Sequence, residues 1–384
     1  KLSGKVTKSM AGIYIHIPFC RQKCYYCDFY KTLKTDQVDI YIAALKKEIG
    51  VRASFLNDKR INTVYFGGGT PSVLNEVQLN SVFHDLNKYF NIQSNAEITF
   101  EANPDDLDFP YLQMLKRTEI NRLSIGIQSF QEEHLRKMNR RHNASQAKAS
   151  VLNAVKAGFN NISVDLIYGL PEMIDEQWKA SLDETFGLPV DHLSAYHLTY
   201  HEGTPFFKKK KKGTLEKLNE NESVNQFNIL IDSAEKAGFR QYEISNFAKN
   251  KKYSRHNTSY WNGTSYLGLG PSAHSFNGVV RRWNIAHMDS YINAVSNNLR
   301  FSEEETLSEM DKYNDYIITG IRTKWGISPE YAKQNFGEQK VNLLEQRIQK
   351  YIQAGKVKFE DGNYILSREG LFISDNIMAD LIII

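Results

Sequence analysis

FCRQKCYYCDFY, the stretch from Phe19 to Tyr30, contains all three cysteines of this 384-residue chain. Cys20, Cys24 and Cys27 follow a C-x3-C-x2-C pattern directly after a short β-rich run, GIYIHI (12–17). With gaps this short, only a loop can aim three thiolates at one point. Thiolates are typical ligands of zinc and of iron–sulfur clusters. Three thiols cannot form a closed set of disulfides, so the pattern predicts a metal centre whose fourth ligand comes from elsewhere.

Three interpretations of these cysteines remain open on the residues alone. A structural zinc site needs a fourth cysteine or histidine, and the nearby His16 lies inside the predicted strand and is expected to point away from the loop. An iron–sulfur cluster held by three cysteines, with one iron left open, fits better. Three reduced cysteines without a metal fit least, because they cluster in a short, tyrosine-rich loop.

Around this loop the sequence alternates between short β-rich runs and longer amphipathic stretches. Helices are predicted over 36–55 and 145–159, the second ending at Gly158. Alternation of this kind predicts an α/β fold, here a partial (β/α)6 TIM-like barrel, with functional residues at the C-terminal ends of the strands. The predicted strands are rich in Ile, Val, Leu, Tyr and Phe, as strands buried on both faces are. They are 12–17, 62–67, 97–102, 122–127, 162–169 and 192–198.

The second half of the chain has a different pattern. The lysine run 208–212 is predicted to be a solvated loop, and 222–239 a helix. The segment 356–366 is a hairpin candidate with Asp361-Gly362 at its turn. The predicted organisation is a barrel over 10–205, a connecting region packed on it over 206–300, and a small α+β, winged-helix-like domain over 301–384. Residues 1–9, before Met10, are interpreted as an upstream segment and left out of the fold prediction.

Composition excludes several classes of protein. The net charge is only +4, from 48 basic and 44 acidic residues, whereas nucleic-acid-binding domains usually carry a strong basic excess. No run of roughly 18 apolar residues supports an integral membrane span, and no signal peptide is recognised at the start. With so few cysteines, the reducing cytoplasm is the expected compartment.

Two further motifs follow predicted strands. GGGTPS (67–72) comes directly after the second strand, and its glycines permit backbone angles that other residues avoid, leaving main-chain groups open to a ligand. Glu101, in FEANP (100–104), ends the third strand, where a carboxylate could accept hydrogen bonds from an ammonium or a ribose. Taken alone, three glycines are more often a turn than a binding site. Taken alone, Glu101 could equally be an acidic loop residue that faces solvent.

The cysteine loop after the first strand of a partial barrel resembles the signature of the radical S-adenosylmethionine (SAM) proteins. The resemblance implies a [4Fe–4S] cluster on Cys20, Cys24 and Cys27. It also implies that the amino and carboxylate groups of SAM chelate the open iron, so that the fourth ligand is a small molecule. In this family a glycine-rich loop at the position of 67–72 contacts the methionine part of SAM.

From Met10 onward, the order of motifs is similar to that of the oxygen-independent coproporphyrinogen III oxidase group and its HemW heme-chaperone branch. YIHIPFC (14–20), RLSIGIQSF (122–130), NRRH (139–142) and DLIYGLP (165–171) are among the matching segments. For three of the implied SAM contacts a plainer role is also open: a sheet-end hydrogen bond, a surface charge or a helix cap for Gln128, Arg140 and Asp165, respectively. The resemblance implies SAM binding by Tyr14, Tyr26, Gly68, Gly69, Thr70, Glu101, Gln128, Arg140 and Asp165.

Two departures favour the HemW branch over the oxidases. The oxidase resemblance would include a cysteine at position 29, which is Phe29 here, and a longer segment before the cluster loop. The motif HNTSYW (256–261) is associated with heme in the HemW branch. It implies His256 as an axial heme ligand, with Tyr260 and Trp261 against a porphyrin face. His274 is a second candidate, either near SAM or structural.

The sequence therefore predicts a heme chaperone that binds a [4Fe–4S] cluster, SAM and heme, and that delivers heme to an acceptor such as a respiratory hemoprotein. A homodimer is a further expectation, and no catalytic residue is assigned. One alternative is an oxygen-independent coproporphyrinogen III oxidase, a radical enzyme of porphyrin biosynthesis that decarboxylates porphyrinogen propionates. The other is an interaction protein in which the cluster is only structural.

Overall fold

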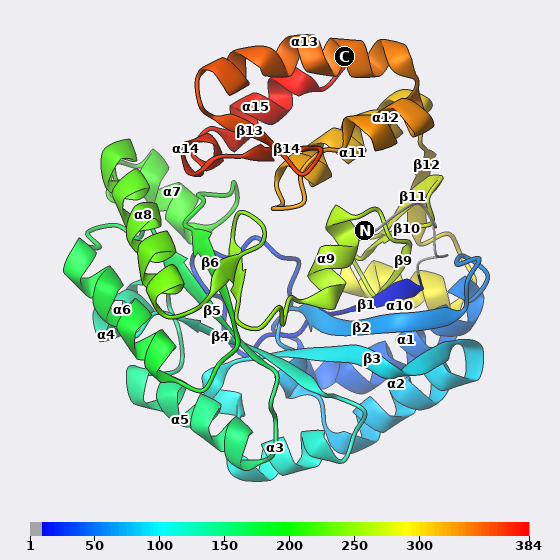
Figure 1. Ribbon diagram of the computed structural model, residues 1–384. Helices are drawn as coiled ribbons and strands as arrows, with labels where there is room; N and C mark the ends of the chain where they lie inside the picture. Colours follow the sequence, from blue (N-terminus) through cyan, green and yellow to red (C-terminus); the bar gives the residue numbers. More distant parts are fainter. Residues whose placement is uncertain (1–9, 384) are drawn as a thin grey trace.

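A curved parallel sheet forms the centre of the molecule (Figure 1), for which a computed structural model describes residues 10–383. Six parallel strands pair in chain order, as the sequence predicts. Their side chains are apolar and largely buried because the sheet is covered on its outer face by helices and its inner face closes around the barrel interior. The strands are β1 Ala11–Ile17, β2 Arg60–Gly68, β3 Asn91–Ala102, β4 Arg122–Gln128, β5 Ile162–Tyr168 and β6 His192–His197.

The helices between these strands lie on the outer face of the sheet (Figure 1). The two helices predicted from the sequence are confirmed as α1 and α5, and the chain leaves α5 through Gly158 with a φ of +94°. The predicted α/β partial barrel is therefore confirmed. The helices are α1 Val38–Arg52, α2 Glu76–Tyr89, α3 Phe109–Lys116, α4 Glu132–Lys137, α5 Ala144–Lys156 and α6 Asp175–Gly187.

The connecting region extends the sheet at both edges, to twelve strands. Next to β1 lie β9 Tyr266–Leu269, β10 His274–Phe276, β11 Val280–Asn284 and β12 Ser302–Thr306. Next to β6 lie β8 Asn246–Ala248 and β7 Arg240–Gln241. A buried carboxylate fastens the first extension to α1, because Glu48 accepts hydrogen bonds from the Tyr291 hydroxyl, the Asn284 amide and the Gly270 N–H. Tyr291 belongs to α10 Met288–Ser296.

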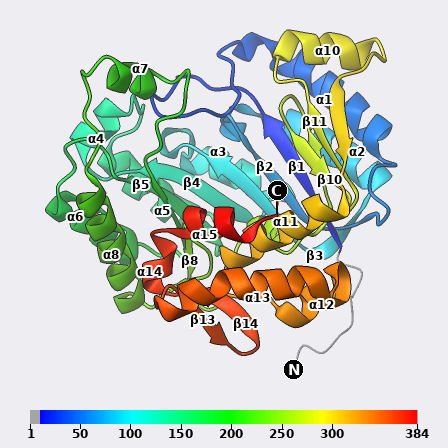
Figure 2. The same cartoon turned by 90° about the horizontal axis from the view of Figure 1, so that it is seen from above.

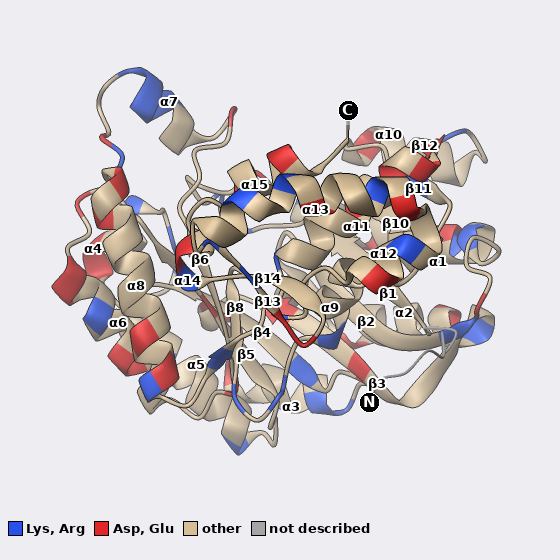
Figure 3. Ribbon diagram, turned by 45° about the horizontal axis from the view of Figure 1, so that its top comes forward, with Lys and Arg blue, Asp and Glu red and all other residues tan. Residues whose placement is uncertain are grey.

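Helices α7 Pro205–Lys211, α8 Glu220–Lys236 and α9 Arg255–Trp261 complete this region. Helix α8 confirms the predicted helix over 222–239. The lysine run is exposed, as expected, but the prediction of a loop is wrong: most of it is the short helix α7, drawn in blue in Figure 3. This helix begins because Thr204 caps the Phe207 N–H and Pro205 occupies its first turn.

The last part of the chain forms a domain with its own apolar core, which includes Tyr313, Ile317, Leu344 and Ile348. Its predicted hairpin is confirmed, with positive φ at both Asp361 and Gly362 in the turn. Seen from above, α13 and α15 lie across the open side of the barrel (Figure 2). The elements are α11 Glu309–Ile321, α12 Pro329–Phe336, α13 Glu338–Gln353, β13 Val357–Glu360, β14 Asn363–Leu366, α14 Arg368–Leu371 and α15 Ser374–Leu381.

The C-terminal domain contacts helix α8 of the connecting region. The Phe372 ring packs edge-on against Phe227 of α8, 5.4 Å between centroids, and Arg368 pairs with Asp232. The predicted domain limits at 205/206 and 300/301 stay predictions, and the predicted upstream segment 1–9 lies outside the described residues. Within the described chain, no helix combines the length and the apolar character needed to cross a membrane.

Candidate functional site

A cavity of about 420 Å³ lies at the C-terminal ends of the barrel strands and is called here the cysteine-side cavity. Cys20, Cys24 and Cys27 line it, on the loop between β1 and α1. The structure therefore brings together the cysteine loop and eight of the nine residues that the resemblance implies for SAM. These are Tyr26, Gly68, Gly69, Thr70, Glu101, Gln128, Arg140 and Asp165.

Each cysteine has a hydrogen-bond donor beside its sulfur. The Thr70 hydroxyl donates to Cys20 Sγ at 3.4 Å, and Arg140 Nη1 donates to Cys24 Sγ at 3.3 Å. Burial raises the pKa of the Cys20 and Cys27 thiols, and the Lys31 ammonium acts in the opposite direction on both. All three thiols are free of disulfides. Donors placed on the sulfurs suit thiolate ligands, because such hydrogen bonds stabilise the negative charge of a bound cluster.

The donor set fits a cluster better than a single metal ion. Among residues 10–383, no group of three or more His, Cys, Asp or Glu side chains is arranged to hold one ion. In a cluster each thiolate binds a different iron, so the sulfurs stand farther apart than around one zinc. His16 is not available as a fourth ligand, because its Nδ1 lies 3.1 Å from the Tyr14 hydroxyl and its Nε2 2.9 Å from the Tyr30 carbonyl oxygen.

The glycine motif packs against the cysteine loop. The Gly69 N–H donates to the Ile17 carbonyl at 2.8 Å, and the Thr70 N–H donates to the Phe19 carbonyl at 2.7 Å. A Cβ on Gly69 would lie 2.7 Å from both of these oxygens, which is too close for any other residue. The Gly69 N–H is therefore used within the fold, whereas contact of the motif with a ligand stays a prediction. The first task of this glycine is to let β2 support the loop that carries the cysteines.

Two partly buried carboxyl groups face the cysteine-side cavity. Glu101 accepts hydrogen bonds from the Tyr65 hydroxyl at 2.6 Å and the Gly68 N–H at 3.3 Å, and Asp165 accepts one from Ser124 at 3.2 Å. Burial is the main reason that the pKa of Glu101 is raised to about 7 and that of Asp165 to about 6. Neither forms an ion pair within the described residues, and two such groups in one cavity favour a cationic ligand, such as a sulfonium or an ammonium.

Arg140 joins the cysteine loop to the strand ends. Besides Cys24 Sγ, its guanidinium donates to Asn103 Oδ1 at 2.7 Å and to the Gly126 carbonyl at 2.6 Å. Beside it, Gln128 ends β4 with a φ of +69°, where the pairing with β5 shifts register. A non-glycine residue in this conformation is strained, and such strain is typical of functional sites.

Sequence reasoning misplaced one residue of this cavity and missed others. Tyr14 does not line the cavity, because its ring packs one layer below, against His16, Tyr65 and His256. Asn103 follows Glu101 in the same motif, so its position after the third strand could have indicated it. The lining residues from β2, β4, β5 and β6 follow from their inward alternation, but only once the barrel is known. His197 and His201 line it too, as their place after the sixth strand suggests, and the residues not anticipated include Tyr65, Asn103, Arg122, Ser124, Ser194 and Tyr196.

The three residues that the resemblance implies for heme do not share one environment. Tyr260 and Trp261 line a second cavity of about 970 Å³, next to the C-terminal domain. His256 is buried, with Nδ1 2.8 Å from Thr63 Oγ1 and Nε2 2.8 Å from the Tyr260 hydroxyl. Burial lowers its pKa to about 3. His256 as an axial ligand stays a prediction, and it requires that one of these two hydrogen bonds opens when heme binds.

The second histidine candidate, His274, also stands apart from the cysteine-side cavity. It is exposed on β10, and its ring stacks on Trp283 of β11 with 6.4 Å between centroids. This placement favours the structural role that the sequence left open for it.

Comparison with known proteins agrees with this geometry. The family model for the radical SAM superfamily matches residues 14–185, and that for the HemN C-terminal domain matches residues 307–373. The chain is 33% identical over 377 residues to the heme chaperone HemW of Lactococcus lactis subsp. lactis (strain IL1403), covering 95% of this chain and 97% of the relative. It is 30% identical to the heme chaperone HemW of Bacillus subtilis (strain 168), covering 96% and 98%.

One solved structure has the same fold over nearly the whole chain. It is the coproporphyrinogen III oxidase HemN of Escherichia coli, described as a radical SAM enzyme, with a TM-score of 0.84 and 23% identity. The match covers 98% of this chain and 91% of that one. At this identity the likeness supports the fold, and it does not distinguish the oxidase from the chaperone.

Proposed function

Because the chain belongs to the HemW family of radical SAM proteins, we propose that it is a heme chaperone, which binds heme and passes it to an acceptor hemoprotein. The family predicted from the sequence motifs is confirmed. The chain matches two relatives named heme chaperone HemW over almost their full length. Its C-terminal part matches the HemN C-terminal domain.

The cysteine-side cavity is proposed to hold the cofactors of the family. Cys20, Cys24 and Cys27 would bind a [4Fe–4S] cluster, and Glu101 and Asp165 would face the cationic groups of SAM. A cluster with bound SAM can supply one-electron chemistry. The other residues that would contact SAM are Tyr26, Gly68, Gly69, Thr70, Gln128 and Arg140.

The size of the cysteine-side cavity favours the chaperone over the oxidase. Cavities for ligands and cofactors measure about 300–1,000 Å³, and this one, at about 420 Å³, is at the small end of that range although it is proposed to take both the cluster and SAM. An oxidase would need SAM and a porphyrinogen side by side in this space. At its mouth, Phe29 is 63% exposed, an apolar side chain where the oxidase resemblance would include a further cysteine.

The acceptor is proposed to be a hemoprotein, for example a respiratory one, and the protein is proposed to act as a homodimer. The reducing cytoplasm is the proposed compartment, because three free thiols that serve as cluster ligands must stay reduced.

An anaerobic comparison tests the proposed function. The cluster is reconstituted, and separate samples receive hemin or coproporphyrinogen III with SAM and a reductant. The chaperone proposal expects a heme absorption band that titrates to saturation and transfer of that heme to an added apo-hemoprotein, with no decarboxylated product. Product that appears together with 5′-deoxyadenosine would make the protein an oxidase. Iron content without binding of SAM or hemin would leave only a structural cluster.

A further inference from the structure

The longest run of charged residues in the chain, Lys208–Lys212, lies on helix α7, with Lys212 as its C-terminal cap. All five lysines are exposed, and none forms an ion pair with a carboxylate among the residues that the structure describes. Figure 3 shows α7 as the blue helix that projects from the barrel. On the basis of the proposed cluster, we propose that Lys208–Lys212, called here the α7 lysine surface, is the docking site of an acidic one-electron carrier protein that delivers electrons to that cluster.

Helix α7 packs directly on the cysteine loop. The Phe206 N–H donates to the Tyr25 carbonyl at 3.1 Å, and the two rings meet edge-on with 6.2 Å between centroids. The Lys209 ammonium lies 5.1 Å from the centre of the Tyr25 ring. Because Tyr25 stands between Cys24 and Cys27 in the sequence, a protein that docks on α7 comes to lie beside the segment that carries two of the proposed cluster ligands. Electrons pass only over short distances through protein, so a carrier has to dock beside the cluster.

The charge of this region suits an acidic partner. Five positive charges occupy five consecutive residues, whereas the whole chain has a net charge of only +4. The cysteine loop adds two exposed basic residues, Lys23 and Arg21, and the Arg21 guanidinium is 3.5 Å from Asp106. The loop acid Asp28 lies 3.2 Å from His201. A local excess of one sign steers partners of the opposite sign and raises their association rate.

A groove of about 580 Å³ beside α7 offers apolar contact next to these charges. Lys209 lines it, together with the segment 170–174, and the side chain of Ile174 in that segment is 55% exposed. Its carboxylate Glu172 pairs with Lys137, which leaves the lysines of α7 free for a partner. Weak redox complexes bury less than about 1,200 Å² in total, so a short basic helix with one groove is enough for such an interface.

Two other kinds of anionic partner fit α7 less well. Sites for single-stranded nucleic acid combine basic groups with aromatic rings that are open to stacking, whereas the rings of Tyr25 and Tyr200 are covered by Lys209 and Lys210. Helices that bind membrane surfaces have an apolar face, and five consecutive lysines leave none on this part of α7. A carrier protein needs opposite charge and a position beside the cluster, and α7 provides both.

The step that this docking serves is the transfer of one electron. The reduced carrier gives up one electron, and a [4Fe–4S]2+ cluster that accepts it becomes [4Fe–4S]+. No covalent bond of the protein forms or breaks, and no proton is needed for the balance. Flavodoxins and plant-type [2Fe–2S] ferredoxins are carriers of this class, the latter with potentials of about −400 mV.

Charge reversal on α7 tests the proposal in the reconstituted protein, with an acidic flavodoxin and a plant-type ferredoxin as probes. The variant Lys208→Glu/Lys211→Glu/Lys212→Glu keeps Lys209 and Lys210 on their tyrosine rings. We expect its affinity for the carriers, measured by calorimetry, to fall by about tenfold or more, and wild-type binding to weaken with added salt. Stopped-flow reduction of the cluster by the reduced carrier should slow in proportion. Reduction by photoreduced deazariboflavin, a small molecule, should not change.

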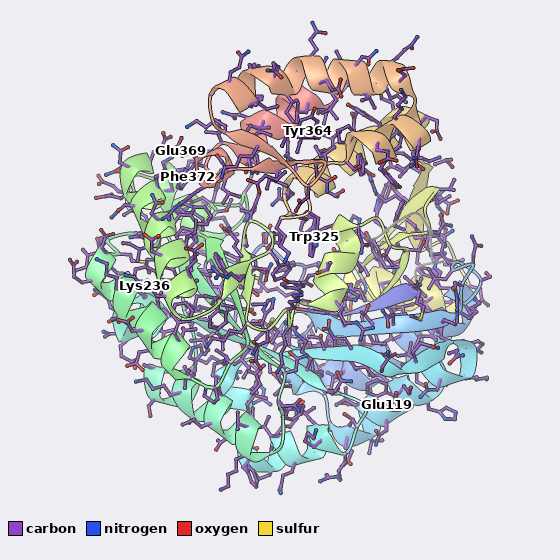
Figure 4. All side chains as sticks on the ribbon, in the orientation of Figure 1. Glu119, Lys236, Trp325, Tyr364, Glu369 and Phe372 are labelled. Atoms are coloured by element: carbon purple, nitrogen blue, oxygen red, sulfur yellow. The ribbon has the colours of Figure 1, made fainter. Side chains whose placement is uncertain are left out.

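A matched control reverses three other exposed lysines, in the variant Lys88→Glu/Lys236→Glu/Lys251→Glu. Lys88 and Lys236 lie in the last turns of α2 and α8, and Lys251 follows β8, so all three lie at the opposite edge of the sheet from the cysteine loop. Figure 4 labels Lys236 on the outer face of the molecule. The net charge changes by the same amount as in the α7 variant, and carrier affinity should stay within about twofold of the wild type.

The outcomes separate this inference from the proposed function. If the wild type takes up no iron, the cluster proposal fails and the docking proposal fails with it, whereas hemin binding still decides the chaperone function. If the cluster forms and neither carrier binds, or if the α7 variant binds as tightly as the control, docking on α7 is overturned. Lysine-dependent binding of phosphatidylglycerol vesicles or of single-stranded RNA, without carrier binding, overturns it as well. If the α7 variant does not fold, glutamine at the same three positions decides, and unchanged carrier affinity overturns the proposal.

Discussion

The imidazole Nε2 of His256 lies 2.8 Å from the phenol oxygen of Tyr260, one helical turn later, while its Nδ1 lies 2.8 Å from Thr63 Oγ1 in β2. The ring also stacks on Tyr65, with 5.0 Å between centroids. One buried side chain thus fastens α9 to the barrel. The same helix carries residues of both cavities, so the position of α9 decides the shape of each.

We expect His256→Ala to lower the free energy of unfolding by about 2–4 kcal/mol, because two buried hydroxyl groups lose their partner. Hemin affinity should fall with the loosening of α9, and the absorption bands of the bound ferric heme should shift, because His256 is the predicted axial ligand. Urea unfolding and heme spectra measure both effects. His84→Ala, at an exposed histidine of α2, is the control and should change neither. Unchanged band positions in His256→Ala would contradict the axial-ligand prediction and leave His256 with its structural role alone.

We expect Cys24→Ala to abolish cluster binding, because a cubane held by two thiolates loses one protein-bound iron and the Arg140 hydrogen bond to that sulfur. Iron and acid-labile sulfide are to be measured after anaerobic reconstitution. Phe29→Ala, two residues after Cys27 and at the rim of the same cavity, should keep its iron. Equal iron content in Cys24→Ala and wild type would refute the cluster assignment.

We expect Gly69→Ala to destabilise the protein by about 2–4 kcal/mol and to reduce cluster loading, because the new Cβ would lie 2.7 Å from two backbone oxygens of the adjacent segment. Gly187→Ala is the matched control: no atom lies within 4 Å of its Cβ position, and it ends helix α6, where alanine is the better helix former. Thermal unfolding of both variants gives the comparison. A Gly69→Ala protein as stable as Gly187→Ala would contradict the packing role of the glycine motif.

The barrel and its cysteine loop were predictable because their signals are local. Strands buried on both faces are apolar throughout. Three cysteines within eight residues indicate a single metal centre. The strands of the connecting region gave no such signal. The segment SEEET of β12 has no apolar residue, and it pairs with β11 through cross-strand ion pairs, Arg281 to Glu305 and Arg282 to Glu304.

The candidate site was predictable only in part, for a similar reason. Motif order indicated which residues belong to the cysteine-side cavity, but not that Tyr14 packs below it or that His256 points into the barrel. The second cavity, next to the C-terminal domain, could not be foreseen, because its walls come from segments around 258–281 and 307–336 that meet only in the folded chain. Helix α7, in contrast, could have been predicted, because Thr204-Pro205 is a typical helix start. The run of lysines after it favoured the interpretation as a loop.

The raised pKa of the Glu101 carboxyl predicts that the stability of the folded protein depends on pH. Its pKa is about 7 in the folded protein and ordinarily 4.5, with burial as the main cause. The folded state therefore keeps a proton that the unfolded chain releases, so stability decreases as pH rises from about 4.5 to about 7, and the cost of the buried charge is complete above that range. The difference corresponds to roughly 3 kcal/mol.

We expect Glu101→Gln to remove this cost, since the amide stays neutral and its oxygen can still accept from Tyr65. Urea unfolding of the cluster-free protein should show little difference from wild type near pH 4.5 and a gain of up to about 3 kcal/mol for the variant at pH 8. Other buried groups, including Asp165, are common to both proteins and cancel in the comparison. Glu119→Gln, at the exposed residue labelled at the edge of the molecule in Figure 4, is the control. A Glu101→Gln gain that is equal at both pH values would mean that the pKa of Glu101 is the same in the folded and the unfolded protein, and that the cysteine-side cavity is far more hydrated than its geometry indicates.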